Sequence, residues 1–140
     1  MSQADEFLEK VKTVAAKEGR YTIDAHLFVF EALEYTLKSI GEHRHVSGQE
    51  LLSGIRDYAL GNFGAMGRMV FNQWGIHESL DFGRIVFALV EAGLMSKTEN
   101  DSQDDFAKGF DFSEVFEAAY TPGTDEPRDK GPGGKSTENA

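Results

Sequence analysis

The sequence predicts a mainly α fold: a compact domain of five helices, followed by a short C-terminal β-hairpin or loop and a disordered tail. Two observations predict this class. Five segments repeat apolar side chains every three to four residues, and turn residues follow each of them. All three prolines lie in residues 121–140, a segment without a large apolar side chain. Such a segment cannot offset the entropy cost of ordering by burial. We therefore expect one helical domain over residues 1–120 and disorder over residues 121–140.

The composition excludes several functional classes. The chain has 140 residues, 14 Lys and Arg against 24 Asp and Glu, and no cysteine. Without cysteine there is no disulfide, thiolate zinc site, iron–sulfur cluster or cysteine nucleophile. No apolar run of about 18 residues is present and the first residues are charged, so we expect no membrane span, no signal peptide and a cytoplasmic location. The net charge of −10 disfavours nucleic acid and anionic lipid as partners.

The first two helices are predicted over residues 5–18 and 23–40. The first is amphipathic, with a single apolar stripe. The second can be capped by Thr22 or Asp24, and its apolar face is broad and includes His26. We interpret this second helix as central to the fold and His26 as a satisfied core histidine.

The start of the third helix carries the clearest local signal in the chain. Ser47 and Glu50 fit a capping box, and Val46 and Leu51 fit the hydrophobic staple around it. We expect a helix that begins here and ends in a glycine-rich turn.

Two further helices are predicted over about residues 64–74 and 80–92. Each ends in a glycine followed by an apolar residue, Ile76 after the first and Leu94 after the second, which fits a Schellman stop. The second of these helices has apolar side chains over more than half of its circumference. We expect it to be as buried as the helix over 23–40.

Residues after Leu94 predict shorter elements. Residues 95–98 can form a strand and 106–112 a returning strand, and Ser113 can cap a last helix over 114–120.

The order of elements over residues 64–110 is that of a winged helix, whose second helix enters the major groove of DNA. The positions of that helix outside the apolar face carry Arg84 against Asp81 and Glu91, and the predicted wing has two bases and four acids. This charge does not suit a phosphate backbone. Packing or protein contact is the better interpretation of a winged-helix-like shape.

The glycine-rich residues 61–68 precede a helix, as phosphate-binding loops do. They lack the Lys-Ser/Thr of a P-loop and a preceding strand, so a turn between helices is the better interpretation. A ligand at this turn requires Arg68 to face inward. The polar side chains that flank residues 61–84 form the candidate binding surface: Arg56, Arg68, Asn72 and Arg84.

No pattern predicts a catalytic, metal or cofactor site. The acidic residues 99–105 lack the central glycine and final glutamate of a calcium loop. His43 and His45 lack the further ligands that a metal needs, which indicates a polar loop, and His77 suits a turn or capping role. No pair of carboxylates falls on an apolar face. We expect no catalytic residue, no cofactor and no bound metal, and the sequence leans against an enzyme without deciding the question.

Several blocks follow one another in order across residues 7–116: FVFEALEYTLKSIG, HVSGQELLSGIRDYALGNFG, WGI, DFGRIVFALVEAGL and DDF. In this combination the chain resembles an uncharacterised bacterial protein family known mainly from planctomycetes and verrucomicrobia. The family has no assigned activity, so the resemblance implies no catalytic residue. It implies a small, free-standing intracellular protein.

The sequence thus favours a non-enzymatic protein-interaction or regulatory domain, because an acidic, aromatic-rich domain carries no catalytic constellation. Its partner would be another protein, of unknown identity, and a homo-oligomer is compatible with this reading. Two alternatives stay open: a winged-helix-like nucleic-acid-associated regulator, and a small-molecule or nucleotide-binding regulatory domain.

Overall fold

The computed structural model describes residues 2–42, 44–96, 106 and 109–118, and its architecture is mainly α, as predicted. The helices are α1 (Gln3–Glu18), α2 (Ile23–Ile40), α3 (Gly48–Phe63), the 3₁₀ turn η1 (Gly64–Met66), α4 (Gly67–Gln73), α5 (Ser79–Glu91) and α7 (Phe112–Ala118). No strand occurs among these described residues. The hairpin predicted over 95–112 and the tail over 121–140 fall largely or wholly outside them.

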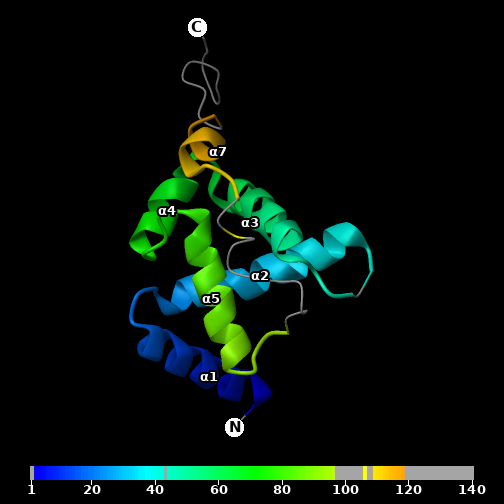
Figure 1. The fold of residues 1–140 in the computed structure, drawn as a ribbon, viewed down its shortest axis with the longest axis vertical. Helices are drawn as coiled ribbons and strands as arrows, with labels where there is room; N and C mark the ends of the chain where they lie inside the picture. Colours follow the sequence, from blue (N-terminus) through cyan, green and yellow to red (C-terminus); the bar gives the residue numbers. More distant parts are fainter. Residues whose placement is uncertain (1, 43, 97–105, 107–108, 119–140) are drawn as a thin grey trace, which may run out of the picture.

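Helices α2 and α5 cross at the centre of the molecule (Figure 1). Helix α1 lies along one end of this crossing, and α3, α4 and α7 lie toward the other end. The central position predicted for α2 and α5 is confirmed by burial, since Val29 and Ala32 of α2 and Phe82, Ile85 and Leu89 of α5 are fully buried.

The helix starts follow the predicted capping chemistry. The Thr22 side chain accepts a hydrogen bond from the Ala25 amide at 3.2 Å, which fixes the start of α2. At α3 the capping box is complete, because the Glu50 amide donates to Ser47 Oγ and the Ser47 amide donates to Glu50 Oε1, at 3.1 and 3.0 Å.

Both predicted Schellman stops are present. The Ile76 amide donates to the Phe71 carbonyl at 2.8 Å, and the Leu94 amide donates to the Leu89 carbonyl at 2.9 Å. The intervening Gly75 has a φ of 90°, in the left-handed region where side chains with a Cβ are strained. Each glycine therefore ends its helix at the predicted place.

The predicted helix over 64–74 is wrong in its first turn. Gly64 has a φ of 56° and a ψ of −136°, which interrupts the helix after α3, and residues 64–66 form a 3₁₀ turn. The tighter 3₁₀ turn shifts the rotational phase of the side chains. As a result Met66, which an uninterrupted helix over 64–74 would turn toward the core with Phe71, is exposed, whereas Phe71 is fully buried.

The last helix begins two residues earlier than predicted and has a different cap. The Glu114 amide donates to the Asp111 carboxylate at 3.0 Å, so Asp111, not Ser113, caps α7. Ser113 lies inside the helix and accepts a hydrogen bond from Arg68. The rings of Phe112 and Phe116 are buried against the rest of the core.

Phe71 is the aromatic centre of the core. Its ring centroid lies 5.7 Å from Phe28 of α2, 5.1 Å from Phe82 of α5, and 5.3 and 5.4 Å from Phe112 and Phe116 of α7. These separations are those of favourable edge-to-face and tilted ring pairs. The C-terminal segment is thus part of the same core as α2 and α5.

His26 is fully buried, as predicted, but it is satisfied at one nitrogen only. Its Nδ1–H donates to the Thr22 carbonyl at 2.8 Å. Its Nε2 atom has no hydrogen-bond partner among the described residues. The prediction of a core histidine is confirmed. The prediction that its side chain is fully hydrogen-bonded is correct for Nδ1 but not for Nε2.

Candidate interaction groove

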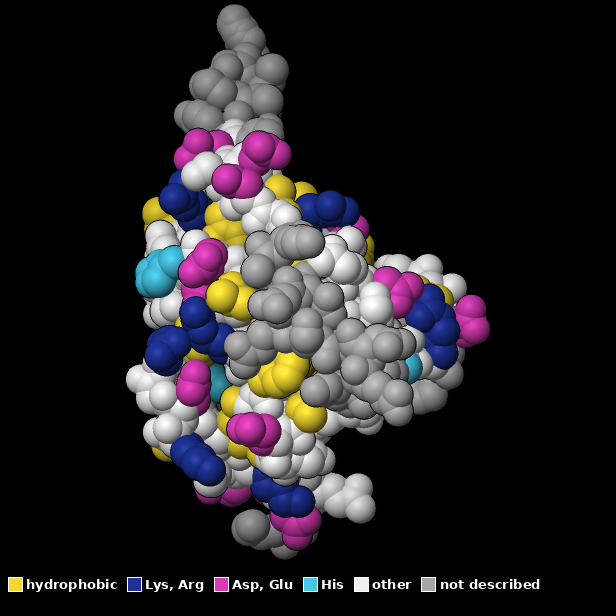
Figure 2. Space-filling view, in the orientation of Figure 1, with side chains coloured by type: hydrophobic (Ala, Val, Ile, Leu, Met, Phe, Trp, Pro, Cys, Tyr) yellow, Lys and Arg dark blue, Asp and Glu magenta, His cyan; other side chains and the backbone are white. Residues whose placement is uncertain are grey.

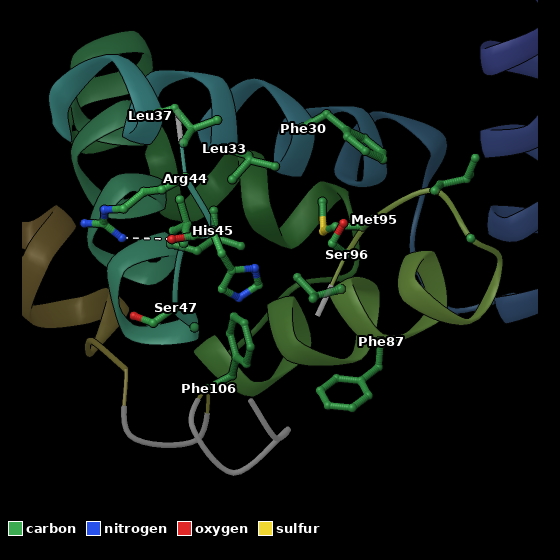
Figure 3. A pocket seen from close by; sticks show the side chains of 16 residues that line it. Phe30, Leu33, Leu37, Arg44, His45, Ser47, Phe87, Met95, Ser96 and Phe106 are labelled. Carbon is green, nitrogen blue, oxygen red and sulfur yellow. Dashed lines mark hydrogen bonds between the residues drawn. The ribbon is translucent and has the colours of Figure 1, made fainter. Parts of the chain in front are cut away.

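A hollow of about 710 Å³ lies between the C-terminal half of α2 and the end of α5 (Figure 3). The segment 44–48, the turn 93–96 and Phe106 complete its walls. Most of the lining side chains are apolar. The sequence placed its candidate surface over 56–84, and the hollow lies elsewhere.

One wall of the hollow is a stripe on α2 formed by Phe30, Leu33 and Leu37, which we call the α2 stripe. The spacing of three and four residues puts these side chains on one face of the helix, and Figure 3 shows them pointing into the hollow. All three are half-buried, although the sequence predicted Leu33 and Leu37 on the broad apolar face of a central helix. Figure 1 shows the reason: α2 extends past its crossing with α5. The apolar face of α2 therefore continues beyond the part of the helix that α5 covers.

The floor of the hollow is Phe106, which packs against α5. Its carbonyl accepts a hydrogen bond from Ser79 Oγ at 2.6 Å. Its Cβ sits so close to Gly83 that a Cβ on Gly83 would lie 2.8 Å away. Glycine at this position therefore sets how near Phe106 approaches, while Val86 and Phe87 of α5 line the hollow beside it.

The polar rim is formed by the segment before α3. Arg44 donates to both carboxylate oxygens of Glu50, at 3.1 and 2.8 Å, and to the His45 carbonyl at 2.8 Å. Hydrogen bonds from Arg44, and then from the Ser47 amide, lower the pKa of Glu50 to about 2. The Arg44–Glu50 pairing holds the segment before α3 at the edge of the hollow. Figure 3 shows the imidazole of His45 projecting into the hollow above Phe106.

A second hollow, of about 560 Å³, continues along the α2 stripe toward the end of the helix. It shares the three residues of the stripe and adds four residues of its own: Glu34, Lys38, Gly41 and Glu42. The two hollows together form an elongated apolar depression, which we call the groove.

The sequence-predicted candidates are not gathered on one surface. Arg56 pairs with its neighbour Asp57 at 3.0 Å. Arg68 points toward α7, where it pairs with Glu117 at 3.2 Å, and its side chain is exposed. The small-molecule hypothesis required Arg68 to face inward at the glycine turn, so the structure removes its basis at that place.

Asn72 and Arg84 belong to one network around a buried carboxylate. Asp81, predicted on a polar face, is only 5% exposed. It accepts hydrogen bonds from Tyr21 Oη and Arg84 at 2.5 and 2.6 Å, and from the His77 amide at 2.8 Å. Asn72 Oδ1 lies 2.9 Å from His77 Nδ1, which gives His77 the turn role that was predicted. The network ties the α1–α2 turn to the start of α5.

We expect replacement of Asp81 by asparagine to cost about 2–3 kcal/mol of unfolding free energy at neutral pH, since it removes charge-assisted bonds inside the protein. Burial alone would raise the pKa of Asp81, but the hydrogen bonds from Tyr21, His77, Glu78 and Arg84 together lower it. A lowered folded-state pKa contributes stability above the unfolded-state pKa of aspartate, and this contribution disappears as the pH falls through the folded-state value.

Urea denaturation of the wild type and Asp81→Asn between pH 7 and pH 3 measures this. The two stability curves should converge toward acid pH. Asp57→Asn, which removes an exposed carboxylate, serves as the control and should change stability by less than about 0.5 kcal/mol. Parallel curves for wild type and Asp81→Asn over the whole range would contradict the role given to the network.

The surface beside α5 does not support the nucleic-acid alternative. Among the described residues on this face, Figure 2 shows Lys and Arg side chains interspersed with Asp and Glu and no stripe of positive charge. Arg84, the one base predicted on that helix face, is paired with Asp81. Phosphate binding needs clustered bases, so we do not propose it.

Within the ranges that the structure covers, no group of three or more His, Cys, Asp or Glu side chains is arranged to hold a metal ion. The stretch 99–105 and His43, both weighed as cation ligands, lie outside the described residues. None of the described helices is both long and apolar enough to cross a membrane.

Fold and site together define the class: an acidic, all-helical domain with an apolar surface groove. Comparison with protein-family models, with curated proteins and with solved structures finds no significant match to the chain. The resemblance to a planctomycete and verrucomicrobial family stays a prediction.

Proposed function

We propose that the chain is a non-enzymatic protein-interaction domain of regulatory type, and that the groove is its docking site. One observation supports this most directly: the α2 stripe is apolar, half-buried and shared by two adjoining hollows. A partner side chain that enters the groove removes this surface from water, which is worth about 25 cal/mol for each Å² buried.

Segments 97–105, 107–108 and 119–140, which lie outside the described residues, are poor occupants of the groove, so we propose an occupant from another molecule. Residues 97–105, 107–108 and 119–140 contain no Phe, Leu, Ile, Val, Met or Trp and a single Tyr, Tyr120. Segments of that composition gain too little from burial in an apolar groove.

The shape favours a helix as the docking element. The α2 stripe spans eight residues, from Phe30 to Leu37, a rise of about 10 Å at 1.5 Å per residue, and the second hollow lengthens it. An amphipathic helix inserts side chains at i, i+3 or i+4 and i+7 into such a groove. Arg44 and Glu50 on the rim already satisfy each other, so they do not form the convergent polar set that orients a small ligand.

A synthetic 16-residue helix with leucines on one face tests the proposal, alongside a peptide of the same composition in scrambled order. We expect the patterned peptide to bind saturably and to shift the NMR resonances of Phe30, Leu33 and Leu37. The scrambled peptide should not. Leu33→Gln, which places an amide in the groove, should weaken binding at least about ten-fold, the loss of one buried anchor.

Met69→Gln is the matched control, because Met69 is exposed on α4, away from the groove. It should leave affinity unchanged, and thermal melting should show that both variants remain folded. Resonance shifts confined to other surfaces, or equal binding of the scrambled peptide, would refute the proposal.

A further inference from the structure

We infer that the docking element is a basic amphipathic helix, with Lys and Arg on the face that turns away from the groove. The inference rests on the proposed function, since it names the chemistry of the partner at the same site. It goes beyond that function because a helix of any charge satisfies the apolar argument alone.

The charges along the groove favour cations. Glu34 and Glu42 line it with side chains that are 71% and 68% exposed. The described Lys and Arg residues beside the groove are already paired: Lys38 Nζ lies 3.7 Å from Glu34 Oε2, and Arg44 Nη2 lies 2.8 Å from Glu50 Oε2. Glu42, 3.9 Å from Arg44, competes for a cation that Glu50 already holds in two hydrogen bonds. Among the described Asp, Glu, Lys and Arg residues beside the groove, three carboxylates (Glu34, Glu42 and Glu50) therefore face two bases.

The charge of the whole domain acts in the same direction. Residues 121–140 hold three bases and four acids, so a net charge of about −9 belongs to residues 1–120. A field of this sign accelerates the association of cationic partners and repels anionic ones, and it weakens with salt. A helix lying on the α2 stripe carries its flanking side chains over Glu34 and Glu42, where this field is reinforced locally.

A second copy of the chain fits the groove less well. It would bring another net charge of −10 against the first. The α2 stripe offers three half-buried side chains, whereas stable protein pairs bury about 800 Å² on each partner. A single helix is narrow enough to contact the α2 stripe, the rim and Phe106 together (Figure 3).

Three peptides with one leucine pattern separate the possibilities. Their polar faces carry lysine, glutamine or glutamate, and binding to the full chain is measured by fluorescence anisotropy from 50 to 300 mM NaCl. We expect the lysine peptide to bind about ten-fold more tightly than the glutamine peptide at 50 mM NaCl, and the glutamate peptide more weakly than both. The advantage of lysine should shrink as salt increases, because salt screens exposed charges.

A pair of double variants tests whether Glu34 and Glu42 are responsible for the preference for a basic helix. Glu34→Gln with Glu42→Gln should weaken the lysine peptide about three- to ten-fold and leave the glutamine peptide unchanged. The control, Glu9→Gln with Glu117→Gln, removes the same charge from carboxylates that are equally exposed, at 64% and 70%, and likewise lie within 4 Å of a base. It should change affinity by less than two-fold.

Each other outcome has a distinct meaning. Equal affinity of the three peptides at every salt concentration would overturn the basic helix while leaving the docking groove intact. Failure of all three peptides to bind would defeat both proposals. An equal loss of affinity for the lysine peptide in the two double variants would show that Glu34 and Glu42 are not responsible for the preference. A dimer in sedimentation that Leu33→Gln dissociates would show that a second copy of the chain occupies the groove.

Discussion

Replacing Gly54 by alanine is expected to destabilise the fold by about 3 kcal/mol, the cost of overpacking a tight contact. A Cβ at this position would lie 1.7 Å from Thr36 Oγ1 and 3.0 Å from Thr36 Cβ. Thr36 cannot turn aside without loss, because it is buried and its hydroxyl donates to the Ala32 carbonyl at 2.7 Å. Helices α2 and α3 must therefore separate, and urea denaturation will report the loss.

Gly61 provides the matched control in the same helix. It is helical and has no atom within 4 Å of an added Cβ. Gly61→Ala should stabilise the domain by about 0.5–1 kcal/mol, because alanine loses less backbone entropy than glycine. The double variant Thr36→Ala with Gly54→Ala should recover part of the loss. If Gly54→Ala behaves like Gly61→Ala, the close crossing of α2 and α3 is wrong.

Replacing Phe71 by alanine is expected to cost about 4 kcal/mol of unfolding free energy, as is typical when an aromatic core residue is truncated. The Phe71 ring is in contact with rings from α2, α5 and α7, including Phe28, Phe82 and Phe116. The cavity left by the missing ring would destabilise α7 first, because this seven-residue helix is too short to persist without its packing. Amide hydrogen exchange should show early loss of protection over residues 112–118.

Phe87→Ala is the comparison for this prediction. Phe87 is half-buried and lines the groove, so its truncation should cost about 1 kcal/mol and leave α7 protected. Equal destabilisation by the two substitutions would mean that Phe71 is not the centre of the core.

The helices were predictable because their boundaries depend on neighbours in sequence. The Ser47–Glu50 capping box and the glycine stops at Gly75 and Gly93 involve groups at most five residues apart. Such contacts form with little help from the rest of the chain. The failures at η1 and α7 are also local: the sequence pattern located the glycine turn but not its 3₁₀ geometry, and Asp111 outcompetes Ser113 as a cap.

The groove was not predictable for a different reason. Periodicity identifies Leu33 and Leu37 as members of an apolar face, but it does not say whether another element covers that face. The cover depends on where α5 crosses α2 and on where it ends, which are properties of the tertiary fold. The same limit hid Asp81, whose main partner Tyr21 is 60 residues away in the chain.

The aromatic rings of the C-terminal segment have a consequence for how the protein is made. Phe106, Phe112 and Phe116 are buried in the core that α2 and α5 begin to form. A nascent chain that has released only its first five helices therefore exposes the apolar surfaces these rings will cover. We therefore expect the core to close only after residue 116 has emerged during synthesis, and the shorter nascent chain to be prone to aggregation until then.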